Sequence, residues 1–175
     1  MTDTQQVQDS VRAVTANPAD TAKRVRADLK AAWPGVKFSV RTRQYSTIYV
    51  DWSDGPRETA VETLLGKYEH GYFDGMDDSY HYTGGNVVDG VDYSVKYLFT
   101  NRHYSDAAEG RFRALLLGYH DGLGDQPDYK IAAIVRREMN EWDAVAEPLP
   151  ATIDDLPSRR RLAELVEDVL GGEGA

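Results

Sequence analysis

The 175-residue sequence contains no cysteine, which excludes disulfide bonds and thiolate metal ligands. Long apolar runs are also missing: the longest candidate, Ala-Leu-Leu-Leu at 114–117, is far shorter than the roughly 18 residues of a membrane-spanning helix. The N-terminal stretch MTDTQQVQDSVRAV has no apolar core segment, so no signal peptide is predicted. These absences lead us to expect a cytoplasmic protein that does not act at a membrane.

Motifs that cradle phosphates or present a nucleophile are missing as well. The sequence has no G-x-x-x-x-G-K-[ST], no G-x-S-x-G, no G-x-G-x-x-G and no H-E-x-x-H. Its histidines are spread along the chain without the spacing of a metal site: His70, His81, His103 and His120. We therefore expect a non-enzymatic protein with no catalytic residue, no cofactor and no bound metal.

Charge is distributed unevenly along this acidic chain. The formal net charge is −9, yet residues 21–50 hold seven basic side chains and one acidic side chain. Residues 51–92 reverse this balance with ten acids and two bases. A local patch, rather than the total charge, determines the field that a ligand meets. The acidic total therefore does not exclude nucleic acid as a partner.

The clearest pattern in the chain lies between Val36 and Asp54. Apolar side chains occupy every second position in two runs that flank the short polar break Gln44–Ser46. Successive side chains of a strand point to opposite faces, so this alternation predicts two half-buried strands joined as a hairpin. The predicted inward face consists of Val36, Phe38, Val40, Ile48, Val50 and Trp52.

Helical periodicity surrounds the hairpin. Pro18 and Pro34 bracket a first helix, and Asp54-Gly55-Pro56 predicts the start of a second, with Asp54 or Gly55 as its cap. Short strands are expected at 80–82 and at 93–99, the latter with Tyr93, Val95, Tyr97 and Phe99 on one face. Later helices are predicted near 106–117, 127–142 and within 153–170.

The order α-β-β-α-β-β predicts an α+β fold, in which helices pack on one face of a mainly antiparallel sheet and further helices follow. We expect one domain over residues 18–145, with a core at 21–105 and a helical extension at 106–142. Residues 1–17 are predicted to be a flexible arm, and residues 146–175 an acidic linker with a C-terminal helix and tail.

Several motifs, in order, resemble one known family. VKFSVRTRQYS, IYVDWSDGP, GYFDGMDDSYHY and LFTNRHYS are similar to motifs of the large polyvalent protein-associated domain catalogued as number 29, over about Thr21 to Ser105. The resemblance implies an accessory protein of a phage, plasmid or conjugative element that works in the cytoplasm of a bacterial host cell. It also implies action by binding, with a host or phage protein as the partner and interference with host defence as the role. It carries over no catalytic residue and sets no oligomeric state.

A basic and aromatic surface is the first candidate site. Lys37, Arg41 and Arg43 share the polar face of the first strand, Tyr49 stands on the polar face of its neighbour, and Arg24 belongs to the same basic block. Sheets that bind single strands combine cations with stacking aromatics, so nucleic-acid binding is the alternative function. This face could equally meet water or the acidic tail of the chain.

A protein partner is the ligand expected for two other groups of residues. Asp74, Asp77 and Asp78 form an acidic loop that could imitate a phosphate backbone, while Arg102 and His103 lie where a strand gives way to a helix. Turn geometry, solubility and helix capping explain all of these residues without a ligand.

Metal-dependent processing of nucleic acid is the remaining alternative. The three aspartates of the acidic loop and His81 would then cluster across a loop and a strand, and replacing Asp77 or His81 would abolish activity. Asp and Gly serving the geometry of a turn explain the same segment more simply.

Overall fold

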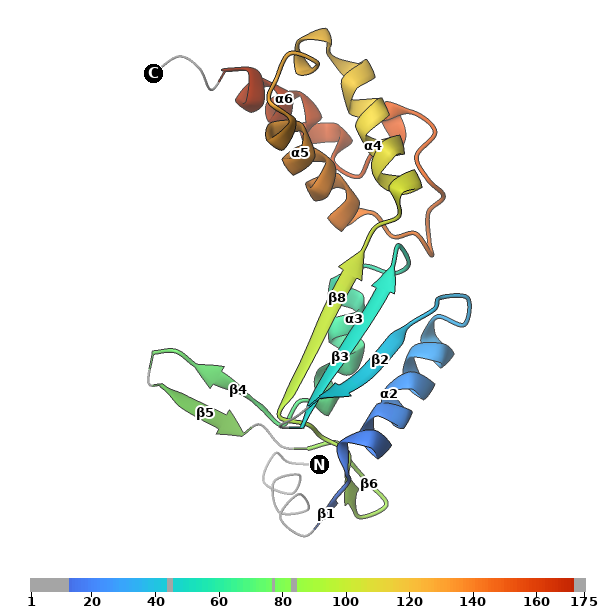
Figure 1. Cartoon of the computed structure of the whole chain (residues 1–175), viewed down its shortest axis with the longest axis vertical. Helices are drawn as coiled ribbons and strands as arrows, with labels where there is room; N and C mark the ends of the chain where they lie inside the picture. The colour runs from blue at the N-terminus through green and yellow to red at the C-terminus, as the bar shows by residue number, and fades with distance from the viewer. Residues whose placement is uncertain (1–12, 44–45, 77, 83–84, 172–175) are drawn as a thin grey trace. The chain divides into compact units, whose positions relative to one another are not determined.

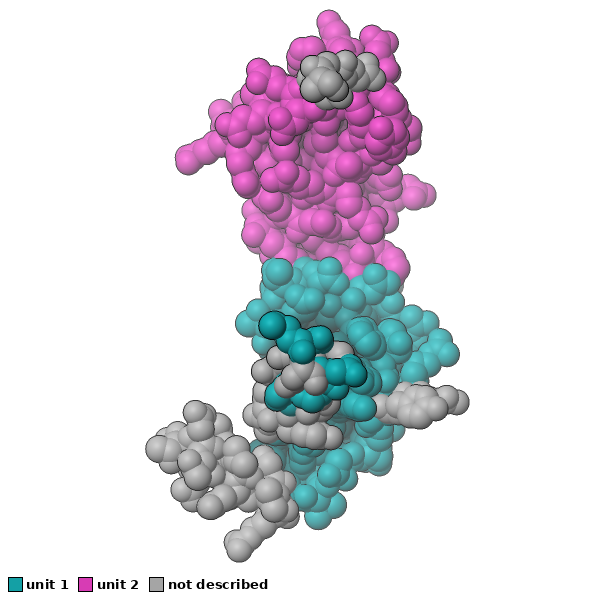
Figure 2. Space-filling view, turned by 90° about the vertical axis from the view of Figure 1, so that its left-hand side faces the viewer, with its two compact units in different colours: residues 1–52, 58–101 teal, residues 53–57, 102–175 magenta. Residues whose placement is uncertain are grey.

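The computed structural model describes residues 13–43, 46–76, 78–82 and 85–171. They divide into two compact units, coloured separately in Figure 2. Unit 1 consists of the described residues within 1–52 and 58–101, and unit 2 of those within 53–57 and 102–175. The chain therefore passes between the units three times.

A three-stranded sheet forms the centre of unit 1. It contains β2 (Ser39–Arg43), β3 (Thr47–Ser53) and β8 (Tyr97–His103), in the order β2-β3-β8. Strands β2 and β3 are antiparallel, with Val40 opposite Val50, as the alternation predicts. Figure 1 shows β3 and β8 pointing the same way, so the sheet is mixed.

Two helices cover one face of this sheet: α2 (Pro18–Ala32) and α3 (Glu58–Leu65). Asn17 caps α2, since its side chain accepts the backbone N–H of Asp20 at 2.9 Å. Both helices bury their apolar stripes against the same side of the strands. The buried core of unit 1 consists of Ala22, Val25, Leu29, Val40, Ile48, Val50, Trp52, Val61, Leu65, Tyr68 and Val95.

Short strands complete unit 1. A small sheet has the order β1-β7-β6, formed by β1 (Val14–Thr15), β6 (Val87–Val88) and β7 (Val91–Asp92). Strands β4 (Gly71–Asp74) and β5 (Ser79–Tyr82) form an antiparallel hairpin after the 3-10 turn η1, residues 66–68. Since β1 pairs with β7, the end of the predicted N-terminal arm is a strand.

Unit 2 is helical. Helices α4 (Asp106–Tyr119) and α5 (Asp128–Glu141) form a hairpin, and α6 (Leu162–Gly171) follows. The 3-10 turns η2, η3 and η4 occupy residues 121–123, 153–155 and 159–161. Within the predicted acidic tail, three side chains are buried in the core of this unit: Leu156, Leu162 and Val166. That segment is therefore part of a folded unit.

The predicted α+β class is confirmed, but one strand was predicted in the wrong place. The expected strand at 93–99 begins only at Tyr97 and runs to His103. Val95 is instead buried in the core, where its backbone N–H donates to the Tyr68 carbonyl at 2.8 Å. Phe99 is exposed, so Val95 and Phe99 do not share a face.

Asp54 does not cap the helix that follows it. Helix α3 begins at Glu58, and the Asp54 carboxylate accepts the backbone N–H of Ser105 at 3.0 Å. Asp54 and Gly55 have φ of 52° and 64°, so both lie in the left-handed region that a glycine tolerates best. The turn at 53–57 belongs to unit 2.

Among the described residues, none of the helices has the length and apolarity that crossing a bilayer requires.

Candidate functional site

The face of the β2-β3-β8 sheet opposite α2 and α3 carries the most distinctive surface of unit 1. We call it the outward face. Because successive side chains of a strand point to opposite faces, the residues between the core positions lie on the outward face. Its members are Lys37, Ser39, Arg41 and Arg43 on or just before β2, Tyr49 and Asp51 on β3, and Tyr97, Phe99 and Asn101 on β8.

Three aromatic rings lie together on this face. The ring centroids of Tyr49 and Phe99 are 5.2 Å apart, and those of Tyr97 and Phe99 are 6.1 Å apart with planes only 13° from parallel. Phe99 remains 48% exposed and Tyr49 37% exposed. Adjacent strands lie about 4.8 Å apart, so side chains at neighbouring positions on β3 and β8 come into contact. The rings thus form one continuous, partly exposed aromatic surface.

Cations flank the rings on the side of the edge strand β2. Arg41 stands directly opposite Tyr49 in the register. Its Nη2 is 2.6 Å from Asp51 Oδ2, and Asn101 Nδ2 donates to the other oxygen at 3.5 Å. Lys37 and Arg43 are exposed, and among the described residues neither forms an ion pair. The Arg41 side chain is 55% exposed and can reach a ligand, whereas Asp51, with 16% of its side chain exposed, is the more buried partner of the pair.

The structure brings Lys37, Arg41, Arg43 and Tyr49 onto one face, as predicted, but not Arg24. Arg24 lies on α2, which packs against the inner side of the sheet. Its guanidinium carbon lies 4.2 Å from the ring centroid of Tyr93, a cation–π contact within unit 1. Arg24 therefore does not contribute to the outward face.

The acidic loop is only partly described. Asp77 lies outside the described residues, and of Asp74 only the backbone, in β4, is described. Asp78 is exposed with φ of 52°, as an aspartate in a turn often is. His81 Nε2 lies 3.1 Å from Ser79 Oγ. The described part of the chain holds no group of three metal-ligating side chains, and partner binding by the loop stays a prediction.

Arg102 is buried inside unit 2 with only 6% of its surface exposed. Its guanidinium donates to four backbone carbonyls: Asp54 at 2.9 Å, Gly55 at 3.0 Å, Met139 at 3.2 Å and Trp142 at 2.8 Å. Burial lowers its pKa, because a charged group is less stable away from water. These contacts give Arg102 a structural role, in which it joins the turn at 53–57 to the end of α5.

His103 follows at the end of β8 and is exposed. Its backbone carbonyl accepts the N–H of Asp54 at 2.8 Å, and Ser105 caps α4 as predicted by accepting the N–H of Ala108. A partner-binding role for Arg102 and His103 remains a prediction.

One cluster that the sequence did not reveal contains serine, histidine and aspartate. Ser94 Oγ donates to Asp92 Oδ1 at 2.6 Å and lies 2.9 Å from His70 Nδ1, while His70 Nε2 is 3.9 Å from Asp92 Oδ2. A nucleophilic triad needs the histidine between the serine and the carboxylate, with an accessible serine. Here the serine bonds the carboxylate directly and is only 3% exposed. The cluster is structural and connects η1 to the segment after β7.

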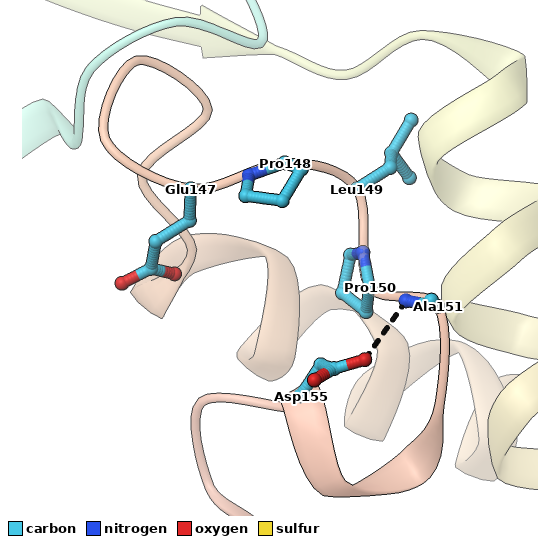
Figure 3. A pocket seen from close by; sticks show the side chains of 6 residues that line it. All are labelled: Glu147, Pro148, Leu149, Pro150, Ala151 and Asp155. Carbon is cyan, nitrogen blue, oxygen red and sulfur yellow. Dashed lines mark hydrogen bonds between the residues drawn. The ribbon is translucent and has the colours of Figure 1, made fainter.

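A pocket of about 400 Å³ in unit 2 is shown in Figure 3. Its lining is Glu147, Pro148, Leu149, Pro150, Ala151 and Asp155. The Asp155 carboxylate accepts the backbone N–H groups of Ala151 at 3.1 Å and Thr152 at 2.8 Å. The N–H and hydroxyl of Thr152 lower the pKa of Asp155. Since this carboxylate is committed to capping a turn, the pocket offers no pair of groups for acid–base chemistry.

Comparison with known proteins gives one match. A family model described as large polyvalent protein associated domain 29 matches residues 16–105, just over half of the chain. No curated protein and no solved structure matches. The matched segment includes every residue of the outward face, whereas helices α4 to α6 lie beyond it.

Proposed function

The chain belongs to the large polyvalent protein associated domain 29 family, and on that premise we propose that it is an accessory protein of a phage or other mobile genetic element that acts by binding nucleic acid. The family is an accessory domain without a known catalytic role. The proposal assigns the binding to the outward face of unit 1.

The observation that carries the proposal is the combination of cations and aromatic rings on this face. Lys37 and Arg43 are exposed and without an acidic partner among the described residues, and Arg41 borders Tyr49. Phosphates are bound by such cations, and bases are bound by partly exposed rings. A surface that served only solubility would not need to expose Phe99 beside Tyr49.

The first experiment is a titration of labelled oligonucleotides with the full chain, followed by fluorescence anisotropy at rising salt. Counterion release predicts that log K falls with log salt by about 0.7 for each phosphate neutralised on a single strand. Three cations would thus give a slope of about −2.

Lys37→Gln with Arg43→Gln should flatten this slope and weaken binding. Lys30→Gln is the matched control, because Lys30 is an exposed cation on α2, away from the outward face. An absence of binding at low salt, or equal loss in the control, would contradict the proposal.

We further infer, from the family's association with mobile elements, that the protein interferes with a host defence system. A mobile element with and without the coding sequence would be introduced into hosts with and without a defence system. The role predicts better establishment only in the defended host. If protection survives Lys37→Gln with Arg43→Gln, a protein partner bound elsewhere would replace nucleic acid as the ligand.

A further inference from the structure

We propose that the ligand of the outward face is a single strand, whose bases stack on Tyr49, Phe99 and Tyr97 while its phosphates follow β2. This inference rests on the proposed function. It adds the strandedness of the ligand and two residues, Tyr97 and Phe99, that the sequence pattern did not assign to any site.

The two kinds of side chain are separated across the sheet. Arg41 and Arg43 lie on the edge strand β2, whereas the rings lie on β3 and β8. One row across the sheet therefore leads from Arg41 through Tyr49 to Phe99. A single strand has the same asymmetry, with phosphates along one side and bases along the other.

The rings also have the spacing of a stacking platform. The ring centroids are 5.2 and 6.1 Å apart, and Tyr49 and Phe99 keep 37% and 48% of their surface exposed, so a base can reach both. Base-stacking sheets commonly hold two or three bases in this way. The faces of bases within a duplex are covered by their neighbours, so these rings could contact only the ends of a double helix.

Charge on the face argues against a duplex for a second reason. Asp51 lies between Arg41 and Asn101, and the chain as a whole carries a net charge of −9. A duplex presents a dense array of phosphates on both sides of its grooves and needs a broad basic surface. A single strand can place its few phosphates along β2 and its uncharged bases over the region near Asp51.

The test compares oligothymidine and oligouridine of about a dozen nucleotides, a length within the site sizes of single-strand binders, with a duplex of the same length. The full chain should bind the single strands at least about tenfold more tightly than the duplex. Phe99→Ala and Tyr49→Ala should each weaken single-strand binding about tenfold and leave duplex binding unchanged. Tyr129→Ala, at an exposed tyrosine of unit 2, should change neither affinity.

A second readout does not depend on affinity. Phe99→Trp keeps a ring at this position and adds a fluorophore to the three native tryptophans, so a stacked base should quench emission beyond the change seen with the wild-type chain, while binding is retained. Circular dichroism on each variant checks the fold, which should be preserved because Phe99 and Tyr49 are exposed.

Three results would overturn the inference. If single strands and duplex bind equally well, and binding still depends on Lys37 and Arg43, then base stacking is contradicted but the proposed function is not. An absence of binding to any nucleic acid would remove both. Dimerisation of the free chain that Phe99→Ala abolishes, with single-strand affinity unaffected, would assign the rings to a second copy of the chain.

Discussion

The two units use arginine in opposite ways. In unit 2, Arg102 is buried, and four of its five N–H donors bind backbone carbonyls of the same unit. In unit 1, Arg43 and Arg41 lie exposed on an edge strand beside aromatic rings. The difference shows that residue type alone does not define a binding site. What matters is whether the donors have already been used by the fold.

The same contrast holds for carboxylates. Glu138 in unit 2 is fully buried and accepts the backbone N–H of Ser158 at 3.1 Å together with its hydroxyl. Asp51 in unit 1 borders the outward face and pairs with a half-exposed arginine. Glu138 thus holds two segments of unit 2 together, whereas Asp51 lies beside a surface that a ligand can reach.

Among these predictions, replacing Arg102 should cause the largest change, a loss of folding stability. Arg102→Ala leaves four carbonyls without their donor and opens a cavity, so we expect a loss of about 3 kcal/mol or more in the free energy of unfolding. Urea denaturation, followed by near-ultraviolet circular dichroism, measures this loss.

Arg102→Lys tests the geometry of the same contacts. A lysine ammonium is a single point and cannot span four carbonyls, so most of the loss should persist. Wild-type stability in the lysine variant, or unchanged stability in the alanine variant, would contradict a structural role for Arg102.

Replacing Asp51 should cause a smaller change. It should alter the affinity for nucleic acid and leave folding stability unchanged. Asp51→Asn removes a negative charge beside the rings and releases Arg41 from its ion pair. We expect affinity for a single strand to rise by about threefold at low salt, since a partly exposed ion pair is worth on the order of 1 kcal/mol. The anisotropy titration measures this change, with Asp125→Asn, at an exposed aspartate of unit 2, as the control. A fall in affinity would show that Asp51 positions Arg41 for the ligand.

Replacing Glu69 should cause the smallest change, a gain in folding stability that depends on pH. Burial raises the pKa of Glu69, and the nearby Glu62 adds to the rise, although the N–H of Leu98 opposes it. A carboxyl group whose pKa is raised by folding begins to cost stability as pH rises above its ordinary pKa, and the cost is complete above the raised pKa. Glu69→Gln should therefore stabilise the chain at neutral pH, and the gain should vanish as pH falls below the carboxyl's ordinary value. Thermal unfolding across this range measures it; an equal gain at all pH values would contradict a burial-raised pKa as the cause.

Local patterns predicted the parts of the fold that local geometry determines. The hairpin of β2 and β3, the cap at Ser105 and the helices of unit 2 all follow from spacing within a few residues. The start of β8 could not be predicted in this way. Alternation runs unbroken from Tyr93 to Phe99, and only the pairing of Val95 with the residues around η1 shows that the first part is not in the strand.

Only part of the candidate site was predictable, for the same reason. Lys37, Arg41, Arg43 and Tyr49 alternate within one hairpin, so their common face is visible in the sequence. Tyr97 and Phe99 join them only because β8 pairs with β3, which lies far from it along the chain. The partners of Arg102 come from two segments that are distant in the sequence, so its burial could not be predicted from local spacing.

Photo-crosslinking of an oligonucleotide that carries iodouridine tests base stacking on the outward face most directly, since excited iodouridine reacts with aromatic side chains that stack on it. The full chain would be irradiated in the complex and the modified peptides identified by mass spectrometry. Stacking predicts crosslinks at Tyr49, Tyr97 or Phe99. Crosslinks confined to α2 or to unit 2 would contradict it.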